Sequence, residues 1–242
     1  MAVHVHRFDP ARFVRRAGPA VAVRTVTDQL ASRRISFGLR CDLSNLPAAV
    51  PGKVPIQMSA RDARGFTGFD RELAETTGVN YLEVLLRTWM CARGIKALYA
   101  ADSADGRPVY AQWLIRRPDD WRLQNKPPHD ALAEGEVLLE GAYTFVAFRG
   151  VGAMADGMGQ VLRVARDEGS VAAITYVLAD NVASLRGCAR VGFVLDHVRL
   201  NTTHLGRERS ERRPVDAGAR QVWETAVAAA GTRKAAPALS PG

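Results

Sequence analysis

The sequence predicts an α/β protein in which helices cover both faces of a mixed central sheet. Three observations support this prediction. Hydrophobic residues make up 47% and charged residues 24% of the 242 residues, which are values typical of globular proteins. From residue 54 onward, apolar runs of strand length alternate with segments of helical period. Some of these strands are joined by a tight turn and others by a helix, so one sheet must contain both antiparallel hairpins and parallel crossovers.

The first 53 residues are polar and arginine-rich, and we interpret them as an N-terminal extension. Prolines and a glycine mark the linker that ends this extension, and Gly94 stops the helical stretch that follows it. The predicted elements of this half are a helix at 20–33, a strand at 36–43, the linker at 43–53, a strand at 54–60 and a helical stretch at 69–93.

The second half begins with a hairpin, because the turn pair Asp105-Gly106 separates two apolar segments. Gly141 lies inside a long apolar segment and predicts a bulge there. We expect the main domain to span residues 54–205, and residues 206–242 to form a partly disordered tail. The predicted elements are strands at 96–102 and 107–115, a loop at 116–135, a strand at 136–148, a helix at 152–168, a strand at 171–179, a helix at 181–191, a strand at 192–200 and a helix at 214–230.

Charge and cysteine content narrow the classes of function. Arginine dominates the net charge of +8, which we interpret as genome composition or, alternatively, as a surface for a polyanion. Three widely spaced cysteines and five histidines outside any ligand spacing predict neither a disulfide framework nor a metal site. No apolar run approaches 18 residues and the N-terminus lacks an apolar signal core, so we expect a cytoplasmic protein without a membrane partner.

A glycine-rich turn lies between the long strand and the following helix and reads Arg149-Gly150-Val151-Gly152. Backbone N–H groups at a helix N-terminus bind anions, and glycines let a phosphate approach the backbone closely. The turn is not a Walker loop, because no Gly-Lys-Ser/Thr follows it. It also lacks the third glycine of the dinucleotide-binding fingerprint, since Ala155 occupies that place.

Two segments taken together resemble the GNAT acyltransferase superfamily. The pyrophosphate loop of that family reads Arg/Gln-x-x-Gly-x-Gly/Ala, and residues 149–154 match it except at Met154. The second family signature is a strand, an asparagine, a helix and Gly-Phe, which Asn181 and Gly192-Phe193 match at the expected spacing. The resemblance implies a sheet whose fourth and fifth strands splay apart around acyl-CoA.

The resemblance covers about residues 54–200. It implies an acyl-CoA donor, most often acetyl-CoA. The residues that it assigns to CoA binding are Phe145, Val146 and Ala147 at the strand end, Arg149, Gly150, Val151, Gly152, Ala153 and Met154 in the loop, and Asn181 and Ser184 at the next helix start.

Candidate catalytic residues flank these segments. Glu136 and Glu140 are four residues apart on one strand, so both face the same side, and either is a candidate general base. Cys188 stands where many GNAT members carry a tyrosine that protonates the leaving thiolate. It is therefore either a proton donor or a small buried core residue. The candidate substrate contacts are Gln112, Tyr143 and Thr144.

Three function hypotheses remain open. The first is an N-acyltransferase that moves an acyl group from acyl-CoA to an amine of a small molecule by direct attack. The second is a transferase that takes its acyl group from an aminoacyl-tRNA, for which arginines between 207 and 213 would contact phosphate. The third is a GNAT-fold protein that binds a ligand or a partner without catalysis. The N-terminal segment is also a candidate for packing against a second subunit in a homodimer.

Overall fold

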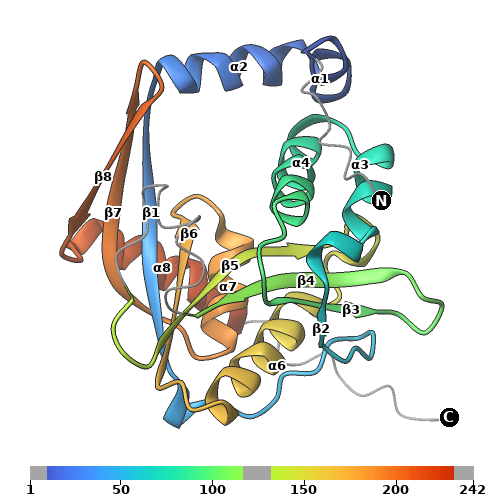
Figure 1. Cartoon of the computed structure of the whole chain (residues 1–242). Coiled ribbons are helices and arrows are strands. Elements are labelled where there is room, and N and C mark those ends of the chain that lie inside the picture. Colours follow the sequence, from blue (N-terminus) through green and yellow to red (C-terminus); the bar gives the residue numbers. More distant parts are fainter. Residues whose placement is uncertain (1–9, 117–131, 232–242) are drawn as a thin grey trace, which may run out of the picture.

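The computed structural model describes residues 10–116 and 132–231. Its centre is an eight-stranded mixed sheet with the order β2-β3-β4-β5-β6-β1-β7-β8 (Figure 1). The α/β class predicted from the sequence is confirmed. The strands are β1 (Ala31–Asp42), β2 (Ser59–Arg61), β3 (Leu98–Asp102), β4 (Pro108–Ile115), β5 (Glu136–Thr144), β6 (Ala172–Leu178), β7 (Val194–His204) and β8 (Arg207–Arg213). The helices are α1 (Pro10–Ala17), α2 (Pro19–Leu30), α3 (Gly68–Glu75), α4 (Gly78–Ala92), α6 (Ala153–Asp167), α7 (Val182–Arg190) and α8 (Ala217–Gly231).

Helices cover both faces of the sheet, as predicted. On one face, which we call the α4 face, the ring of Phe69 in α3 stacks on Trp113 of β4 with their centroids 5.9 Å apart. On the opposite face, the α6 face, α6 packs so closely that a Cβ at Gly157 would lie 2.3 Å from the Tyr110 ring. Tyr110 and Trp113 therefore point to opposite sides of β4, as strand alternation requires.

The parallel strands β5 and β6 are paired over only three residues. Glu136 to Leu138 pair with Ala172 to Ile174, whereas the strands themselves continue to Thr144 and Leu178. Beyond the last pair, the Thr175 hydroxyl donates a 2.9 Å hydrogen bond to the carbonyl of Leu139. The strands thus splay apart toward their carboxyl ends, and we call this opening the splay.

The largest departure from the sequence prediction concerns the N-terminal extension. β1 lies between β6 and β7 and pairs antiparallel with both strands. Residues 31–42 therefore belong to the middle of the sheet, and the boundary expected between residues 53 and 54 does not separate an extension from a domain. The local pattern indicated the strand but not its partners, because strand pairing depends on contacts distant in sequence.

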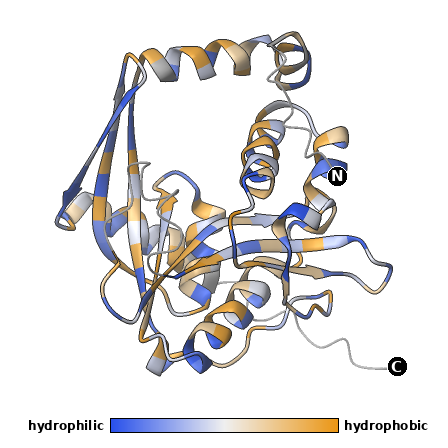
Figure 2. Cartoon of the chain, viewed as in Figure 1, coloured by the Kyte–Doolittle hydropathy of each residue, from blue (hydrophilic) through white to orange (hydrophobic). Residues whose placement is uncertain are grey.

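Element lengths differ from the predictions at several strand ends. Where a strand was expected at 54–60, the structure has only the short strand Ser59–Arg61. The strand expected at 136–148 ends at Thr144 and is followed by a short 3-10 turn, Val146–Phe148. The expected bulge is present, since Gly141 has φ +64° and the pairing between β4 and β5 shifts beside it. The tail expected from residue 206 supplies an eighth strand, β8, which is hydrophilic along its length (Figure 2). Most of the loop expected at 116–135 and the end of the tail lie outside the described residues.

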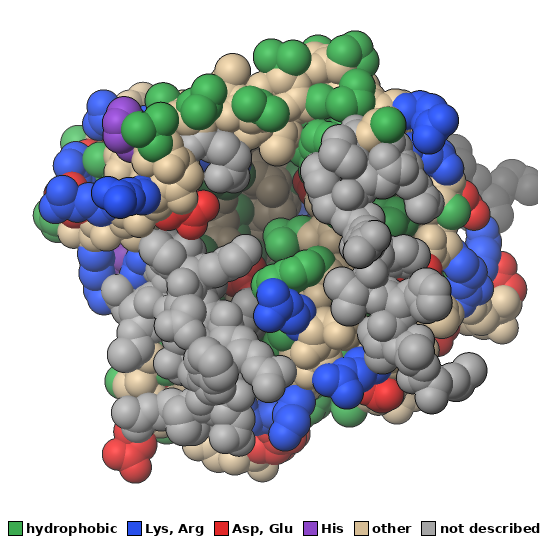
Figure 3. Space-filling view, turned by 45° about the horizontal axis from the view of Figure 1, so that its top comes forward, with side chains coloured by type: hydrophobic (Ala, Val, Ile, Leu, Met, Phe, Trp, Pro, Cys, Tyr) green, Lys and Arg blue, Asp and Glu red, His purple; other side chains and the backbone are tan. Residues whose placement is uncertain are grey.

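Helix α2 forms a bridge above the α4 face. It begins beside α1, which packs on α4, and ends at the tip of the ribbon formed by β1 and β7 (Figure 1). The space-filling view shows a hollow beneath this helix (Figure 3). In the described part of the chain, no helix combines the length and the apolar character that a membrane crossing needs.

We predict that Gly157→Ala destabilises the protein because its new methyl group would collide with the buried Tyr110 ring. Overpacking of this kind costs about 1–3 kcal/mol. Gly159→Ala is the matched control in the same helix, because its Cβ would come no closer than 3.3 Å to the Arg163 side chain. Urea unfolding of the two variants measures the difference, and equal free energies of unfolding would contradict this packing of α6.

Candidate functional site

Strand register places one candidate base at the splay, on the α4 face. Glu140 is opposite Trp113 in the β4–β5 pairing, and Trp113 stacks on α3. Glu136 and Glu140 alternate with Val137 and Leu139, so both glutamates share this face. Glu140 lies two residues beyond Leu138, where the pairing with β6 ends. Glu140 therefore borders the splay on the side of the hollow beneath α2.

Glu136 lies at the opposite, closed end of this strand pair. It forms an ion pair with Arg40 of β1 and accepts a hydrogen bond from the backbone N–H of Ala133. Burial acts to raise the pKa of Glu136, but these hydrogen bonds and the Arg40 charge outweigh it and lower the pKa. The structure thus separates the two candidate bases, and it ties Glu136 into a bridge between β1 and β5.

Arg87 of α4 holds the bulge of β5. Its guanidinium donates 2.9 Å and 2.8 Å hydrogen bonds to the carbonyls of Gly141 and Ala142 and lies 4.9 Å from the centroid of the Tyr143 ring. Burial lowers the pKa of Arg87, and the charges of Glu83 and Glu140 oppose that effect. The bulge would otherwise leave two carbonyls without ladder partners. Sequence reasoning missed Arg87, because nothing in a helical pattern shows which backbone it reaches.

Glu72 of α3 fastens the end of β5. Its carboxylate accepts hydrogen bonds from the backbone N–H of Val146, at 2.9 Å, and from the Tyr143 hydroxyl, at 3.0 Å. Burial and then the Glu72 charge raise the pKa of Tyr143. The backbone N–H of Phe145 donates to Val109 of β4. The structure therefore gives protein partners to two of the three strand-end residues that the resemblance assigns to CoA.

The glycine loop, residues 149–154, leads from β5 into α6. Gly150 and Gly152 have φ values of +79° and +86°, which glycine adopts without strain. The first intrahelical bond runs from Asp156 N–H to Gly152, and Gly152 provides no side-chain cap. The N–H groups of residues 153–155 therefore precede the helical ladder and point outward. This arrangement is suited to a pyrophosphate, whose charge the helix dipole also favours.

Arg149 points away from that helix end. Its guanidinium donates a 2.8 Å hydrogen bond to Asn80 of α4 and lies 3.4 Å from Glu83. It also lies 5.4 Å from the centroid of the Tyr143 ring. In this arrangement Arg149 joins the glycine loop to α4, and the backbone of the loop, not this charge, faces the helix N-terminus.

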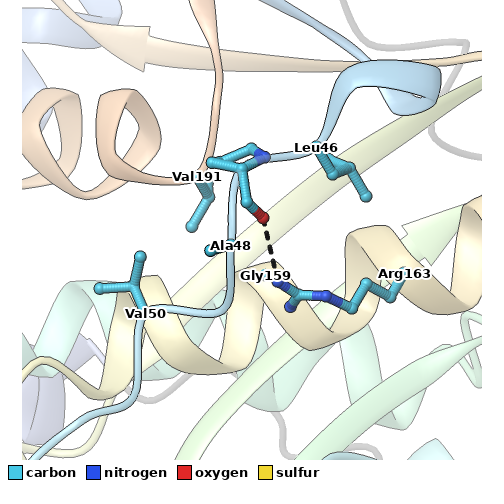
Figure 4. Close-up of a pocket in the computed structure, with 7 residues that line it drawn as sticks. Leu46, Ala48, Val50, Gly159, Arg163 and Val191 are labelled. Atoms are coloured by element: carbon cyan, nitrogen blue, oxygen red, sulfur yellow. Dashed lines mark hydrogen bonds between the residues drawn. The ribbon is translucent and has the colours of Figure 1, made fainter.

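The linker before β2 is packed against the glycine loop. Gly52 N–H donates a 2.9 Å hydrogen bond to Asp156, and Lys53 N–H donates a 2.7 Å bond to the carbonyl of Val151. Farther along α6, Arg163 donates a hydrogen bond to the carbonyl of Pro47, and both residues line a small pocket (Figure 4). The linker therefore supports the start of α6 rather than acting as a free connector.

The remaining candidate substrate and CoA contacts do not all lie on one face of the sheet. Gln112 is fully buried on the α6 face, where its amide oxygen accepts a 2.8 Å hydrogen bond from Tyr110, whereas Tyr143 packs against Phe69 on the α4 face. The Thr144 carbonyl accepts a hydrogen bond from Arg149. Asn181 caps α7 by accepting from the backbone N–H of Ser184, at 3.2 Å. The structure does not bring Gln112 and Tyr143 together.

Cys188 is fully buried in the core. Burial and then the neighbouring Cys41 raise the pKa of the Cys188 thiol to about 12. A thiol with so high a pKa is a weak proton donor to a thiolate at neutral pH. This geometry favours the interpretation of Cys188 as a core residue.

Comparisons with known proteins give likeness of fold only. No family profile and no curated protein matches the sequence. A GNAT-family acetyltransferase from Colwellia psychrerythraea has 17% identity and a TM-score of 0.49, covering 73% of this chain and 58% of its own. A GCN5-related N-acetyltransferase from Sphaerobacter thermophilus has 14% identity and a TM-score of 0.46, covering 83% and 59%. A tandem GNAT protein from the clavulanic acid biosynthesis pathway has 15% identity and a TM-score of 0.44, covering 82% and 60%.

The strand arrangement of the chain itself decides the fold. Strands β5 and β6 are parallel and splayed, and the glycine loop and α6 connect them, as the sequence resemblance implies. The fold is that of the GNAT acyltransferases. The chain spans about three fifths of the length of these solved structures. Within residues 10–116 and 132–231, no group of three or more His, Cys, Asp or Glu side chains is placed to hold a metal ion.

We predict that Arg87→Met loosens the bulge and destabilises the protein, because two carbonyls lose charged hydrogen-bond donors. Such bonds contribute about 1.5–3 kcal/mol each before relaxation. Arg93→Met, directly after α4, is the matched control, since Arg93 is exposed and stacks on the Trp89 ring. Chemical unfolding compares the two variants. A loss no larger for Arg87→Met than for Arg93→Met would show that Arg87 does not support β5.

Proposed function

We propose that the protein is an N-acyltransferase that moves an acyl group from acyl-CoA to an amine of a small molecule. The observation that carries this proposal is the splay between β5 and β6, which opens beside the glycine loop and the start of α6. A thioester donor needs both features, because its pyrophosphate requires N–H donors and its extended arm requires a slot between strands. The residues present fit this donor, since α6 begins at Ala153 without a side-chain cap and its first N–H groups precede the helical ladder.

In the proposed complex, the backbone of the glycine loop holds the pyrophosphate and Asn181 lies at the opposite side of the splay. Acyl-CoA supplies the thioester on which the reaction depends. The acceptor approaches from the α4 face, since α6 occupies the other face. The attacking nitrogen forms the amide bond, the carbon–sulfur bond breaks, and Glu140 takes a proton from the nitrogen for transfer to the leaving thiolate.

The paired charges of β8 favour this donor over an aminoacyl-tRNA. Arg213 forms an ion pair with Glu211, and Arg212 forms one with Asp196. Arginines that are neutralised in this way contribute less to phosphate binding. The formal charge of +8 therefore does not require a nucleic-acid partner.

We predict that Gly152→Trp abolishes acetyl-CoA binding, because its Cβ would lie 3.4 Å from the Cα of Gly52 and its indole would displace the backbone of the glycine loop at the start of α6. Gly169→Trp is the matched control at the other end of α6, where φ is +91° and the surroundings are open. Isothermal calorimetry should show micromolar binding to the wild type and to the control only. Normal affinity in Gly152→Trp would contradict the donor site, and salt-sensitive tRNA binding without CoA binding would favour the tRNA-dependent transferase.

We predict that Glu140→Gln slows acyl transfer about 100-fold with little change in acetyl-CoA affinity, because a positioned base contributes about that factor or more. The assay measures CoA thiol release from acetyl-CoA in the presence of primary amines. Glu134→Gln, an exposed site before β5, is the control. A rate for Glu140→Gln equal to that of the control would remove Glu140 as the base.

A further inference from the structure

Strand β8 forms a long, exposed edge of the sheet (Figure 1). Each of its seven residues is opposite a residue of β7, and six of the seven are exposed. The strand at the opposite edge, β2, has three residues. A short edge resists pairing with another chain, whereas a long edge presents a row of backbone groups to which a further strand can bind. Of the two edges that the described part of the chain shows, β8 is therefore the one suited to a partner.

A two-residue turn decides which backbone groups of β8 face outward. Leu205 and Gly206 have φ values of +48° and +75°, as in the type I′ turns that favour hairpins. The residues that close such a turn, here His204 and Arg207, form a hydrogen-bonded pair. The backbone groups of Arg207 therefore face β7.

The outward-facing groups belong to every second residue of β8. Hydrogen-bonded and non-bonded pairs alternate along an antiparallel ladder, so Arg209 faces β7 just as Arg207 does. The Thr202 hydroxyl of β7 donates a 3.4 Å hydrogen bond to the Arg209 carbonyl, which agrees with this direction. The N–H and C=O groups that point away from β7 are therefore those of residues 208, 210 and 212.

A second copy of β8 can bind all of these outward groups in one register. Two identical strands that pair antiparallel are related by a two-fold axis, and an axis at Ser210 brings every outward residue opposite another one. Residue 208 is then opposite residue 212 of the partner copy, and Ser210 is opposite itself. If the axis moves by one residue to either side, one outward residue of each strand has no outward residue opposite it.

The same register pairs opposite charges along β8. The strand reads Arg-Glu-Arg-Ser-Glu-Arg-Arg in chain order. With the axis at Ser210, Glu208 is opposite the partner's Arg212, and Arg209 is opposite the partner's Glu211. Each of these pairs occurs twice, because the axis repeats it in the other direction. Opposite charges directly across a ladder stabilise it.

Shifted registers would place like charges opposite each other at the centre of the contact. An axis at Arg209 would bring two copies of that arginine together, and an axis at Glu211 would bring two glutamates together. Like charges in these positions destabilise a ladder, which is why charged edges usually keep sheets apart. In the Ser210 register the like-charged pair, Arg207 with the partner's Arg213, is confined to the two ends.

We propose that the protein forms a two-fold homodimer in which two copies of β8 pair antiparallel about Ser210. The sheets of the two copies join into one continuous sheet. The occupant of this edge is a second copy of the chain, because one rotation aligns both the outward backbone groups and the opposite charges of its own sequence. The association does not depend on the proposed acyl transfer.

Sedimentation velocity of the full chain at a series of concentrations tests the association. One strand pair buries less than the about 800 Å² per partner of a standard interface, so we expect a Kd of about 10–100 µM. Glu208→Pro removes an outward N–H and should prevent dimer formation. Glu208→Gln keeps that N–H and is the matched control, for which Kd should rise less than about tenfold. Circular dichroism should be unchanged in both variants, since this N–H does not face β7.

Charge reversals at exposed positions of β8 test the register. Arg209→Glu turns two opposite-charge pairs into like-charge pairs, so it should raise Kd about tenfold or more. Glu211→Arg should act in the same direction. In the double variant Arg209→Glu/Glu211→Arg, the pairs are restored with exchanged signs, and Kd should return to within about threefold of the wild type. Arg207→Glu is the matched control, because it changes the net charge equally but faces the partner's Arg213, so it should lower Kd.

A chain that stays monomeric at about 500 µM would overturn the proposal. A dimer whose Kd is unchanged in Arg209→Glu would also overturn it, because the contact would then lie on another surface. Equal effects of Arg207→Glu and Arg209→Glu would show that net charge alone matters, which contradicts the Ser210 register. None of these results bears on the acyltransferase, whose own tests are acetyl-CoA binding and amine-dependent thiol release.

Discussion

The short pairing of β5 and β6 is the constraint on which the rest of the structure depends. Two parallel strands that separate after three pairs expose backbone groups in the interior of a sheet, which is costly unless other groups satisfy them. The strands remain in place because each keeps a full antiparallel partner on its outer edge. β4 supports β5, and β1 supports β6. The central position of β1 therefore stabilises the opening, although β1 takes no part in forming its walls.

Side chains from the α4 face satisfy much of the exposed backbone. Arg87 binds two carbonyls at the bulge, and Glu72 binds the N–H that follows the end of β5. Thr175 reaches across the start of the splay. These contacts connect α3 and α4 to the strand that borders the proposed donor site. A change in either helix would consequently alter the shape of that site without touching a substrate.

Several of the many arginines link elements of the structure. Arg40 and Arg87 bridge elements around β5, and Arg149 ties the glycine loop to α4. Arg212 links β8 to Asp196 of β7. The planar guanidinium suits these tasks because it offers several donors in a fixed geometry. The positive charge of the chain thus reflects internal cross-links as well as composition, and it is no sign by itself of a polyanionic partner.

The sequence by itself determined the local elements, the glycine loop and the fold class, because periodicity, turn residues and helix caps are local properties. It placed Glu140 on a strand, and register then placed that residue at the splay. Only the tertiary structure decided that residues 31–42 enter the sheet between β6 and β7. It also decided which residues of β8 face outward, since that depends on the strand with which β8 pairs. Strand pairing joins residues more than 150 positions apart, and no local pattern specifies such a partner.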